Sequence, residues 1–169
     1  MTLRRFEAAL VWARRAVEYD TDRVEEHIRN IRRRQDSLAT TKYSPEERRD
    51  IMEQAVYQGI DVVFGGGKRY LLPEDSKGKR GDGEDLTVEL KSLGYRVVED
   101  REGMIRLKKG DKAFGLFAPS HMDPEIDRPY LHPCQPTLAE MTVKAMELLS
   151  GDPQGFFLMV EGSQIDWAC

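Results

Sequence analysis

The sequence predicts an α/β fold, with a mostly parallel sheet that carries helices on both faces and a helical segment at the N-terminus. From about residue 60 onward, short apolar or β-branched runs alternate with amphipathic segments. The run Phe156–Val160 is apolar throughout, which is typical of a strand covered on both sides. Gly94 and Gly151 follow two amphipathic segments directly, where helices commonly end.

The N-terminal region predicts two helices. Apolar residues recur at three- and four-residue steps over Leu3–Tyr19 and form one helical stripe. A second helix is expected from Thr21 or Asp22 to Arg34, with a narrower apolar face that needs a partner. The polar stretch 35–43 is typical of a linker. We therefore divide the chain into a helical segment, 1–43, and an α/β region, 44–169.

The α/β region begins with a third helix, for which Ser44 is a suitable N-cap and Pro45 a suitable first residue. This helix should run to about Gln58 and end at Gly59. Two segments are expected to be surface loops. Residues 74–85 are rich in glycine and charged residues, and residues 120–136 are rich in proline. The remaining elements are expected as strands at Ile60–Phe64, Tyr95–Val98, Ala113–Ala118 and Phe156–Val160, and as helices at Leu86–Leu93 and Thr137–Ser150.

Length and composition indicate one water-soluble domain. The chain has 169 residues, of which 40% are hydrophobic and 33% charged. No apolar stretch approaches the roughly 18 residues that a membrane-spanning helix needs. Charges interrupt any apolar core of an export signal near the N-terminus, so no signal peptide is expected in this sequence and its localisation stays undetermined.

The distribution of charge and the number of cysteines bear on two classes of function, nucleic-acid binding and zinc or redox chemistry. Residues 1–49 hold 12 Lys and Arg against 9 Asp and Glu, whereas the whole chain carries a net charge of −4. Blocks of like charge on helices are usually solvated faces, so nucleic-acid binding is not expected. Cys134 and Cys169 lack the spacing of a zinc or redox motif, and whether they pair is left open.

Three glycines, Gly65–Gly67, precede Lys68 and Arg69 and invite comparison with a phosphate-binding loop. The spacing does not fit, because Val62 stands where the loop needs its first glycine and Arg69 where it needs Ser or Thr. A tight turn that leaves a buried strand is the expected role.

Two carboxylates, Glu161 and Asp166, follow the most apolar strand. Ligand sites of doubly wound sheets lie at the carboxyl ends of strands, and carboxylate oxygens there suit Mg²⁺ or Zn²⁺. Spacing alone also allows a simpler role, in which one of the two caps the next helix.

Five stretches, taken in their order along the chain, resemble landmarks of alkaline phosphatases. The resemblance as a whole extends over about residues 50 to 168. The ends of the chain do not match the order expected for that family. The five stretches are Asp61–Tyr70, Leu86–Val98, Gly115–Met122, Leu138–Thr142 and Gly155–Ala168.

The resemblance implies a metal site. The position of Glu161 corresponds to a magnesium ligand of the family and that of Asp166 to a zinc ligand. Zinc in these enzymes activates a serine nucleophile and water, as in other two-metal sites. A histidine ligand would stand four residues after Asp166, one position past Cys169, so the metal site is expected to be incomplete.

No nucleophile is assigned. The pair Asp36-Ser37 is like the family's Asp-Ser pair, but Leu38 stands where a small residue is expected and the pair lies too close to Gly65. None of the three histidines is assigned a catalytic role. The catalytic residues therefore stay unknown.

The resemblance implies an alkaline-phosphatase-like hydrolase of phosphate monoesters, present as a partial domain that is expected to be inactive or nearly so by itself. Family members are typically periplasmic or extracellular. The alternative is a non-catalytic α/β module whose basic N-terminal helices contact a partner protein or a polyanion through Arg29, Arg32, Arg33 and Arg34. The oligomeric state is undetermined.

Overall fold

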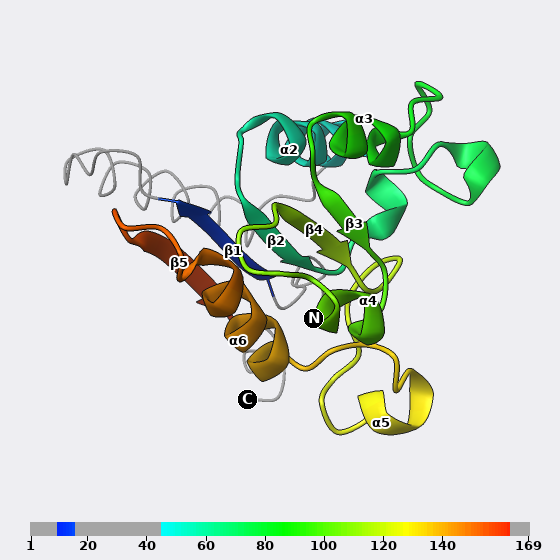
Figure 1. The fold of residues 1–169 in the computed structure, drawn as a ribbon. Coiled ribbons are helices and arrows are strands. Elements are labelled where there is room, and N and C mark those ends of the chain that lie inside the picture. Colours follow the sequence, from blue (N-terminus) through cyan, green and yellow to red (C-terminus); the bar gives the residue numbers. More distant parts are fainter. Residues whose placement is uncertain (1–9, 16–44, 163–169) are drawn as a thin grey trace.

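A computed structural model describes residues 10–15 and 45–162 of the chain. These residues form a five-stranded sheet in the order β3-β4-β2-β1-β5, with helices on both of its faces (Figure 1). The strands are β1 (Leu10–Arg15), β2 (Val62–Gly65), β3 (Arg96–Val98), β4 (Ala113–Leu116) and β5 (Phe156–Glu161). The predicted α/β class is confirmed.

The described sheet is mixed: two of its four strand pairings are parallel, and four of its five strands run in the predicted common direction. β2 and β3 both pair with β4 in parallel, and Val62 and Arg96 are both opposite Ala113. β1 is antiparallel to β2 and to β5, so β5 runs in the same direction as β2. Four strands therefore share one direction, and their carboxyl ends lie at one edge of the sheet.

The helix predicted over Leu3–Tyr19 is wrong where the structure describes it, because Leu10–Arg15 is the strand β1. Its backbone pairs with β2 over Val11–Ala13 and with β5 along all six residues. Neighbours on both sides supply the hydrogen bonds that a helix would form internally, and such tertiary pairing overrides local periodicity. The second predicted helix and the linker lie outside the described residues.

One face of the sheet packs against α6 (Leu138–Leu149) and α4 (Arg101–Ile105). Alternate strand residues such as Val62 and Phe64 point into this core, where they meet buried side chains of both helices. Helix α6 contributes Met141, Ala145, Leu148 and Leu149, and α4 contributes Met104.

The opposite face packs against α2 (Pro45–Tyr57) and α3 (Leu86–Ser92). Val63 and Phe114 point to this side, where the buried side chains of the helices are Val56, Leu86 and Leu90. Figure 1 shows the two helix layers on opposite sides of the sheet. The prediction of helices on both faces is confirmed.

The predicted ends of the helices agree closely with the structure. Pro45 opens α2, and Gly59 and Gly94 take positive φ angles of 69° and 85° just beyond α2 and α3. Thr137 caps α6 in a capping box with Glu140, because each side chain accepts from the other's backbone N–H. The five-residue helix α4 was not predicted, although Asp100 at its N-cap is a usable signal.

The two expected loops contain short helical turns. The 3₁₀ turn η2 (Glu74–Ser76) lies in the first, and α5 (Arg128–Leu131) lies in the second. Another 3₁₀ turn, η1 (Lys68–Tyr70), follows β2. In Figure 1 the segment around α5 projects beyond the layers of the sheet.

The strand predicted over Phe156–Val160 is present as β5, but the expectation that it is buried is wrong. Among the described strands β5 lies at the edge of the sheet, and Phe156–Glu161 are half-buried except Val160, which is 41% exposed. Its apolar side chains still pack on both cores: Phe156 and Leu158 on one side, Phe157 and Met159 on the other.

Candidate functional site

The candidate site lies at the carboxyl edge of the parallel strands. Gly66 follows β2, Glu99 follows β3, Phe117 follows β4, and Glu161 is the last residue of β5. Sheets of this kind bind their ligands outside this edge, because the loops there converge while the strands beneath them are fixed by packing. The segments after β2, β3 and β4 contact one another directly.

The glycine turn is clamped to the segment after β4. The Gly67 N–H donates to Ala118 O (3.1 Å) and to Ser120 O (2.6 Å), and the Lys68 N–H donates to Ala118 O (3.0 Å). Gly67 has φ = 95°, a conformation that favours glycine. Because carbonyl oxygens of the chain already occupy these donors, the turn is not a phosphate cradle. The structural role predicted for it is confirmed.

The two cations after the turn also have partners within the chain. The Lys68 Nζ pairs with Glu99 at the end of β3. The Arg69 Nε donates to Pro119 O at 2.9 Å, and its backbone N–H donates to the same oxygen at 3.1 Å. Lys68 and Arg69 therefore tie together the segments that follow β2, β3 and β4.

Glu161 is half-buried at the carboxyl end of β5, and its backbone is opposite Leu10 of β1. Strand alternation places it on the same face as Phe157 and Met159. Asp166, the other predicted metal ligand, lies outside the described residues, as does Cys169.

The described residues do not fit a metal site by themselves. Within 10–15 and 45–162, no three His, Cys, Asp or Glu side chains gather closely enough to hold a metal ion. Zinc in proteins is usually held by four ligands, and magnesium needs six oxygens of which water supplies several. We derive no reaction step through a metal from this part of the chain.

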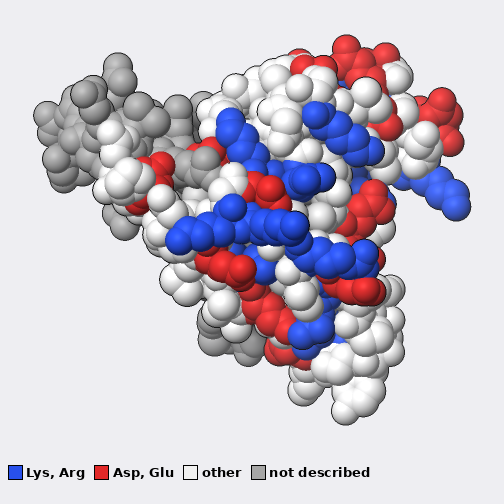
Figure 2. Space-filling model, viewed as in Figure 1, with Lys and Arg blue, Asp and Glu red and all other residues white. Residues whose placement is uncertain are grey.

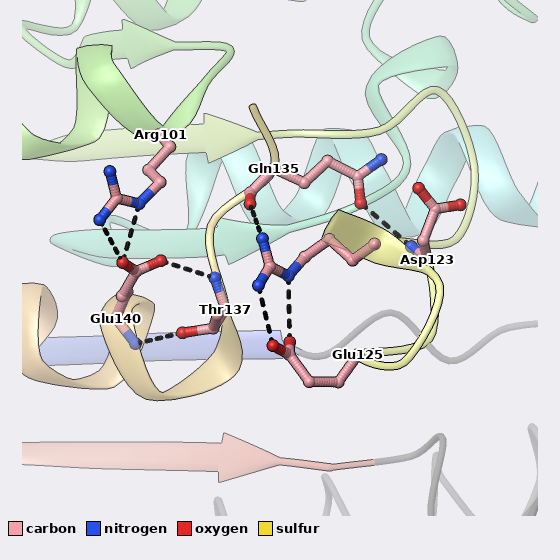
Figure 3. A network of polar contacts seen from close by, with 7 residues as sticks. Arg101, Asp123, Glu125, Gln135, Thr137 and Glu140 are labelled. Carbon is pink, nitrogen blue, oxygen red and sulfur yellow. Dashed lines mark hydrogen bonds and ion pairs between the residues drawn. The ribbon is translucent and has the colours of Figure 1, made fainter. Parts of the chain in front are cut away.

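Next to the carboxyl edge, a polar network holds the segment around α5 (Figure 3). The Arg128 guanidinium donates to both oxygens of Glu125, at 3.0 and 2.8 Å, and to Gln135 O at 3.1 Å. The Gln135 side chain accepts from the Asp123 N–H at 3.0 Å, and the Asp123 carboxylate pairs with His132. The contact between His132 and Asp123 was not predicted, because a separation of nine positions in a loop follows no regular spacing.

Arg101, at the start of α4, links this segment to α6. Its guanidinium donates to Glu140 Oε1 at 2.8 and 2.5 Å, and its backbone N–H donates to Cys134 O at 2.8 Å. The hydrogen bond from Arg101 lowers the pKa of the Glu140 carboxyl and raises that of Arg101 itself. In the same way, the hydrogen bond from Arg128 lowers the pKa of Glu125.

A family model for alkaline phosphatases matches residues 24–169. The chain belongs to the alkaline phosphatase family. The resemblance read from the five sequence landmarks is thereby confirmed. The match also includes residues 24–49, which sequence reasoning had placed outside the resemblance.

Relatives of known identity agree with this assignment. Alkaline phosphatase 3 of Bacillus subtilis is 44% identical over 109 residues, which cover 64% of this chain and 21% of the relative. The human tissue-nonspecific isozyme of alkaline phosphatase is 35% identical over 138 residues, covering 70% of this chain and 26% of the relative. The chain thus spans about a fifth to a quarter of these alkaline phosphatases.

A solved structure supports the fold as well. The crystal structure of Thermus thermophilus alkaline phosphatase superimposes with a TM-score of 0.57 at 34% sequence identity, covering 63% of this chain and 22% of that one. The chain therefore represents a partial alkaline phosphatase domain.

Several of the other residues singled out from the sequence lie outside the described part. Ser37 and the arginine group Arg29, Arg32, Arg33 and Arg34 belong to the segment 16–44. Cys134 lies within the described part and is an exposed free thiol. No helix among the described residues combines the length and the apolar character needed to cross a membrane.

Proposed function

We propose that the chain is an incomplete alkaline phosphatase domain in which Glu161 occupies a magnesium-ligand position and Asp166 a zinc-ligand position. The family match over residues 24–169 carries this proposal. Glu161 at the carboxyl end of β5 supports it, because ligands of α/β folds lie at that edge. The substrate class that follows is a phosphate monoester.

We further propose that the chain by itself hydrolyses phosphate monoesters at or near the background rate. Covalent phosphoryl transfer needs a nucleophile held beside the groups that stabilise the developing charge. The sequence offers no serine that matches the family's nucleophile segment, and the described residues gather no metal-binding cluster. The relatives are about four to five times as long as the part that this chain covers.

The experiment is a steady-state assay with p-nitrophenyl phosphate in the presence of Zn²⁺ and Mg²⁺. We compare the full chain with its Glu161→Ala and Asp166→Ala variants, and expect all three to give the same near-background rate. Zinc-dependent turnover of the full chain that Asp166→Ala abolishes would contradict the proposed inactivity, and a Ser37→Ala variant would then test whether Ser37 is the nucleophile.

A further inference from the structure

Positive charge gathers at the amino-terminal edge of the parallel strands, opposite the edge that carries Glu161. Residues 91–98 and 106–112 contain six basic residues and one acidic residue, Asp111, although the whole chain has a net charge of −4. We call five of the six the basic band: Lys91, Arg96, Lys108, Lys109 and Lys112. All are exposed except Lys112, which is half-buried.

The backbone brings these side chains together. The Arg96 N–H donates to Lys112 O at 2.8 Å, so the starts of β3 and β4 are adjacent. The Lys112 Nζ lies 5.6 Å from the centre of the Tyr95 ring. Lys109 lies against Gly151, just beyond α6. Figure 2 shows Lys and Arg in a band across the face that carries the segment between α4 and β4.

The cations of the basic band are not held in ion pairs among the described residues, although Figure 2 shows acidic side chains beside them. Within the described residues, none of its five members forms an ion pair, whereas Arg106 beside it pairs with Glu102 at 2.5 Å. The Asp111 carboxylate accepts from the Lys108 backbone N–H at 2.8 Å rather than from a lysine side chain. These cations are therefore available to an external anion.

Two exposed aliphatic residues adjoin the basic band in sequence, but they lie at the ends of helices on opposite faces of the sheet. Leu93, between Lys91 and Arg96, is 41% exposed, and Ile105, directly before the second segment, is 49% exposed. The aromatic residue of the two segments, Tyr95, is buried, so the band presents no ring on which a nucleic-acid base could stack. Clustered lysines without an exposed aromatic ring suit a layer of anionic headgroups better than a nucleic-acid strand.

We propose that the basic band docks the protein on an anionic lipid surface, with its lysines and Arg96 at the headgroups. Lysine is a hydrated point charge on a flexible stem, which suits a diffuse layer of phosphate and carboxylate headgroups. The local charge orients this edge toward the lipid despite the negative net charge of the chain. This proposal is independent of phosphatase activity.

The test is co-sedimentation of the full chain with vesicles of phosphatidylcholine alone or mixed with phosphatidylglycerol. We expect binding to the anionic vesicles that weakens as salt rises, and none to phosphatidylcholine alone. Because each lysine near an anionic surface contributes about 1 kcal/mol, the double variant K108Q/K109Q should bind about 30-fold more weakly.

The matched control is K77Q/K79Q, which removes two exposed lysines from the segment 74–85. It should bind within about twofold of the unmodified chain, since those lysines lie outside the basic band. Circular dichroism melting checks that both variants stay folded. Equal weakening by the two variants, no binding to anionic vesicles, or tighter binding to single-stranded DNA at the same salt would each overturn the proposal.

Discussion

Gly115, in the middle of β4, leaves no space for a side chain. A Cβ there would lie 2.6 Å from Phe117 Cζ, 2.8 Å from Phe64 Cδ1 and 3.0 Å from Val98 Cγ2. Gly115→Ala should therefore lower the free energy of unfolding by about 1–3 kcal/mol, the usual cost of overpacking. Urea denaturation measures this change. Gly81→Ala is the control, because its Cβ would find nothing closer than 3.6 Å, and equal effects of the two substitutions would contradict the argument.

Arg80 is a buried cation with an incomplete set of partners. Its Nη2 lies 2.6 Å from Asp82, 3.2 Å from Glu84 and 3.6 Å from Glu53, whereas its Nη1 has no hydrogen-bond partner among the described residues. Burying a charged group with an unpaired nitrogen is unfavourable. Removing one member of an ion pair is costly when the remaining charge is buried, but the carboxylates of Glu53, Asp82 and Glu84 are 45%, 36% and 61% exposed and stay solvated without Arg80.

We expect Arg80→Met to keep the free energy of unfolding within about 1 kcal/mol of the original, because methionine fills much of the same space. Arg80→Ala should lower it by about 2–4 kcal/mol, through the cavity that it leaves. Urea unfolding at neutral pH separates the two variants. If methionine destabilises the chain as much as alanine does, the ion pairs rather than the packing are what Arg80 contributes.

The conformation or burial of a single residue could be predicted from the sequence only where the chemistry of that residue and its immediate neighbours determines it. The positive φ of Gly67 and the first helical position of Pro45 follow from glycine and proline chemistry. The burial of Arg80 was not foreseeable, because it lies in a stretch of Gly and charge that is typical of surface loops. Its position depends on long-range packing, which local spacing does not encode.

At the scale of elements, helix ends were predictable and β1 was not. Capping and glycine signals act within a few residues, so α2, α3 and α6 begin and end close to their predicted bounds. Leu10–Arg15 lies in a stretch with helical periodicity, but its strand conformation depends on β2 and β5, which lie about 50 and 150 positions later. Similarly, the edge position of β5 follows from the strand order, which no single segment specifies.

The ion pair between α4 and α6 should make stability depend on acid pH. Arg101 lowers the pKa of the Glu140 carboxyl, so its stabilising contribution is complete above the unfolded-state pKa of about 4.3 and disappears as pH falls through the lower folded-state pKa. Glu140→Gln should remove this contribution. Urea unfolding of both forms at pH 7 and near pH 3 measures the difference.

The expected result is that Glu140→Gln is less stable than the unmodified chain at pH 7 and that the gap narrows at pH 3. The hydrogen bond that the Glu140 side chain accepts from the Thr137 N–H does not contribute to this gap, because glutamine also accepts it through its oxygen. Glu147→Gln is the control for the loss of one negative charge on α6, where Glu147 pairs with Lys144. A gap that is independent of pH would contradict the ionic argument.

At the scale of the whole molecule, the family could be identified from the order of short sequence landmarks. Each of these landmarks includes part of a strand or helix of the same α/β fold. Gly65–Tyr70, Gly115–Met122 and the β5 region all lie at or near strand ends, and the contacts of Gly67 and Arg69 with residues 118–120 bring two of these landmarks together. The metal site could be predicted only as a resemblance, since Glu161 is described and Asp166 is not. This chain spans about a quarter of the length of the human relative. Metal ligands that come from other parts of such a relative cannot be predicted from this sequence.

The proposed assignment of Glu161 and Asp166 as metal ligands leads to a prediction about metal affinity for the whole chain. If Glu161 and Asp166 are the ligands that the chain offers, they form a hard oxygen site, which suits Mg²⁺ better than Zn²⁺ because zinc prefers nitrogen and sulfur ligands. We expect Mg²⁺ to bind no tighter than about millimolar, the weak end of oxygen-ligand sites. Isothermal titration calorimetry with each ion measures the affinities.

Cys169 requires a control, because a thiolate three residues after Asp166 can recruit Zn²⁺ by itself. Any micromolar zinc binding should therefore disappear in Cys169→Ser, while the weak magnesium binding persists and is lost in Glu161→Ala. A cysteine thiol binds zinc as the deprotonated thiolate. Zinc binding that depends on the thiol should therefore strengthen as pH rises toward the ordinary cysteine pKa of about 8.5. Micromolar zinc binding that survives Cys169→Ser would instead indicate that the chain assembles a complete metal centre from residues in addition to Glu161 and Asp166.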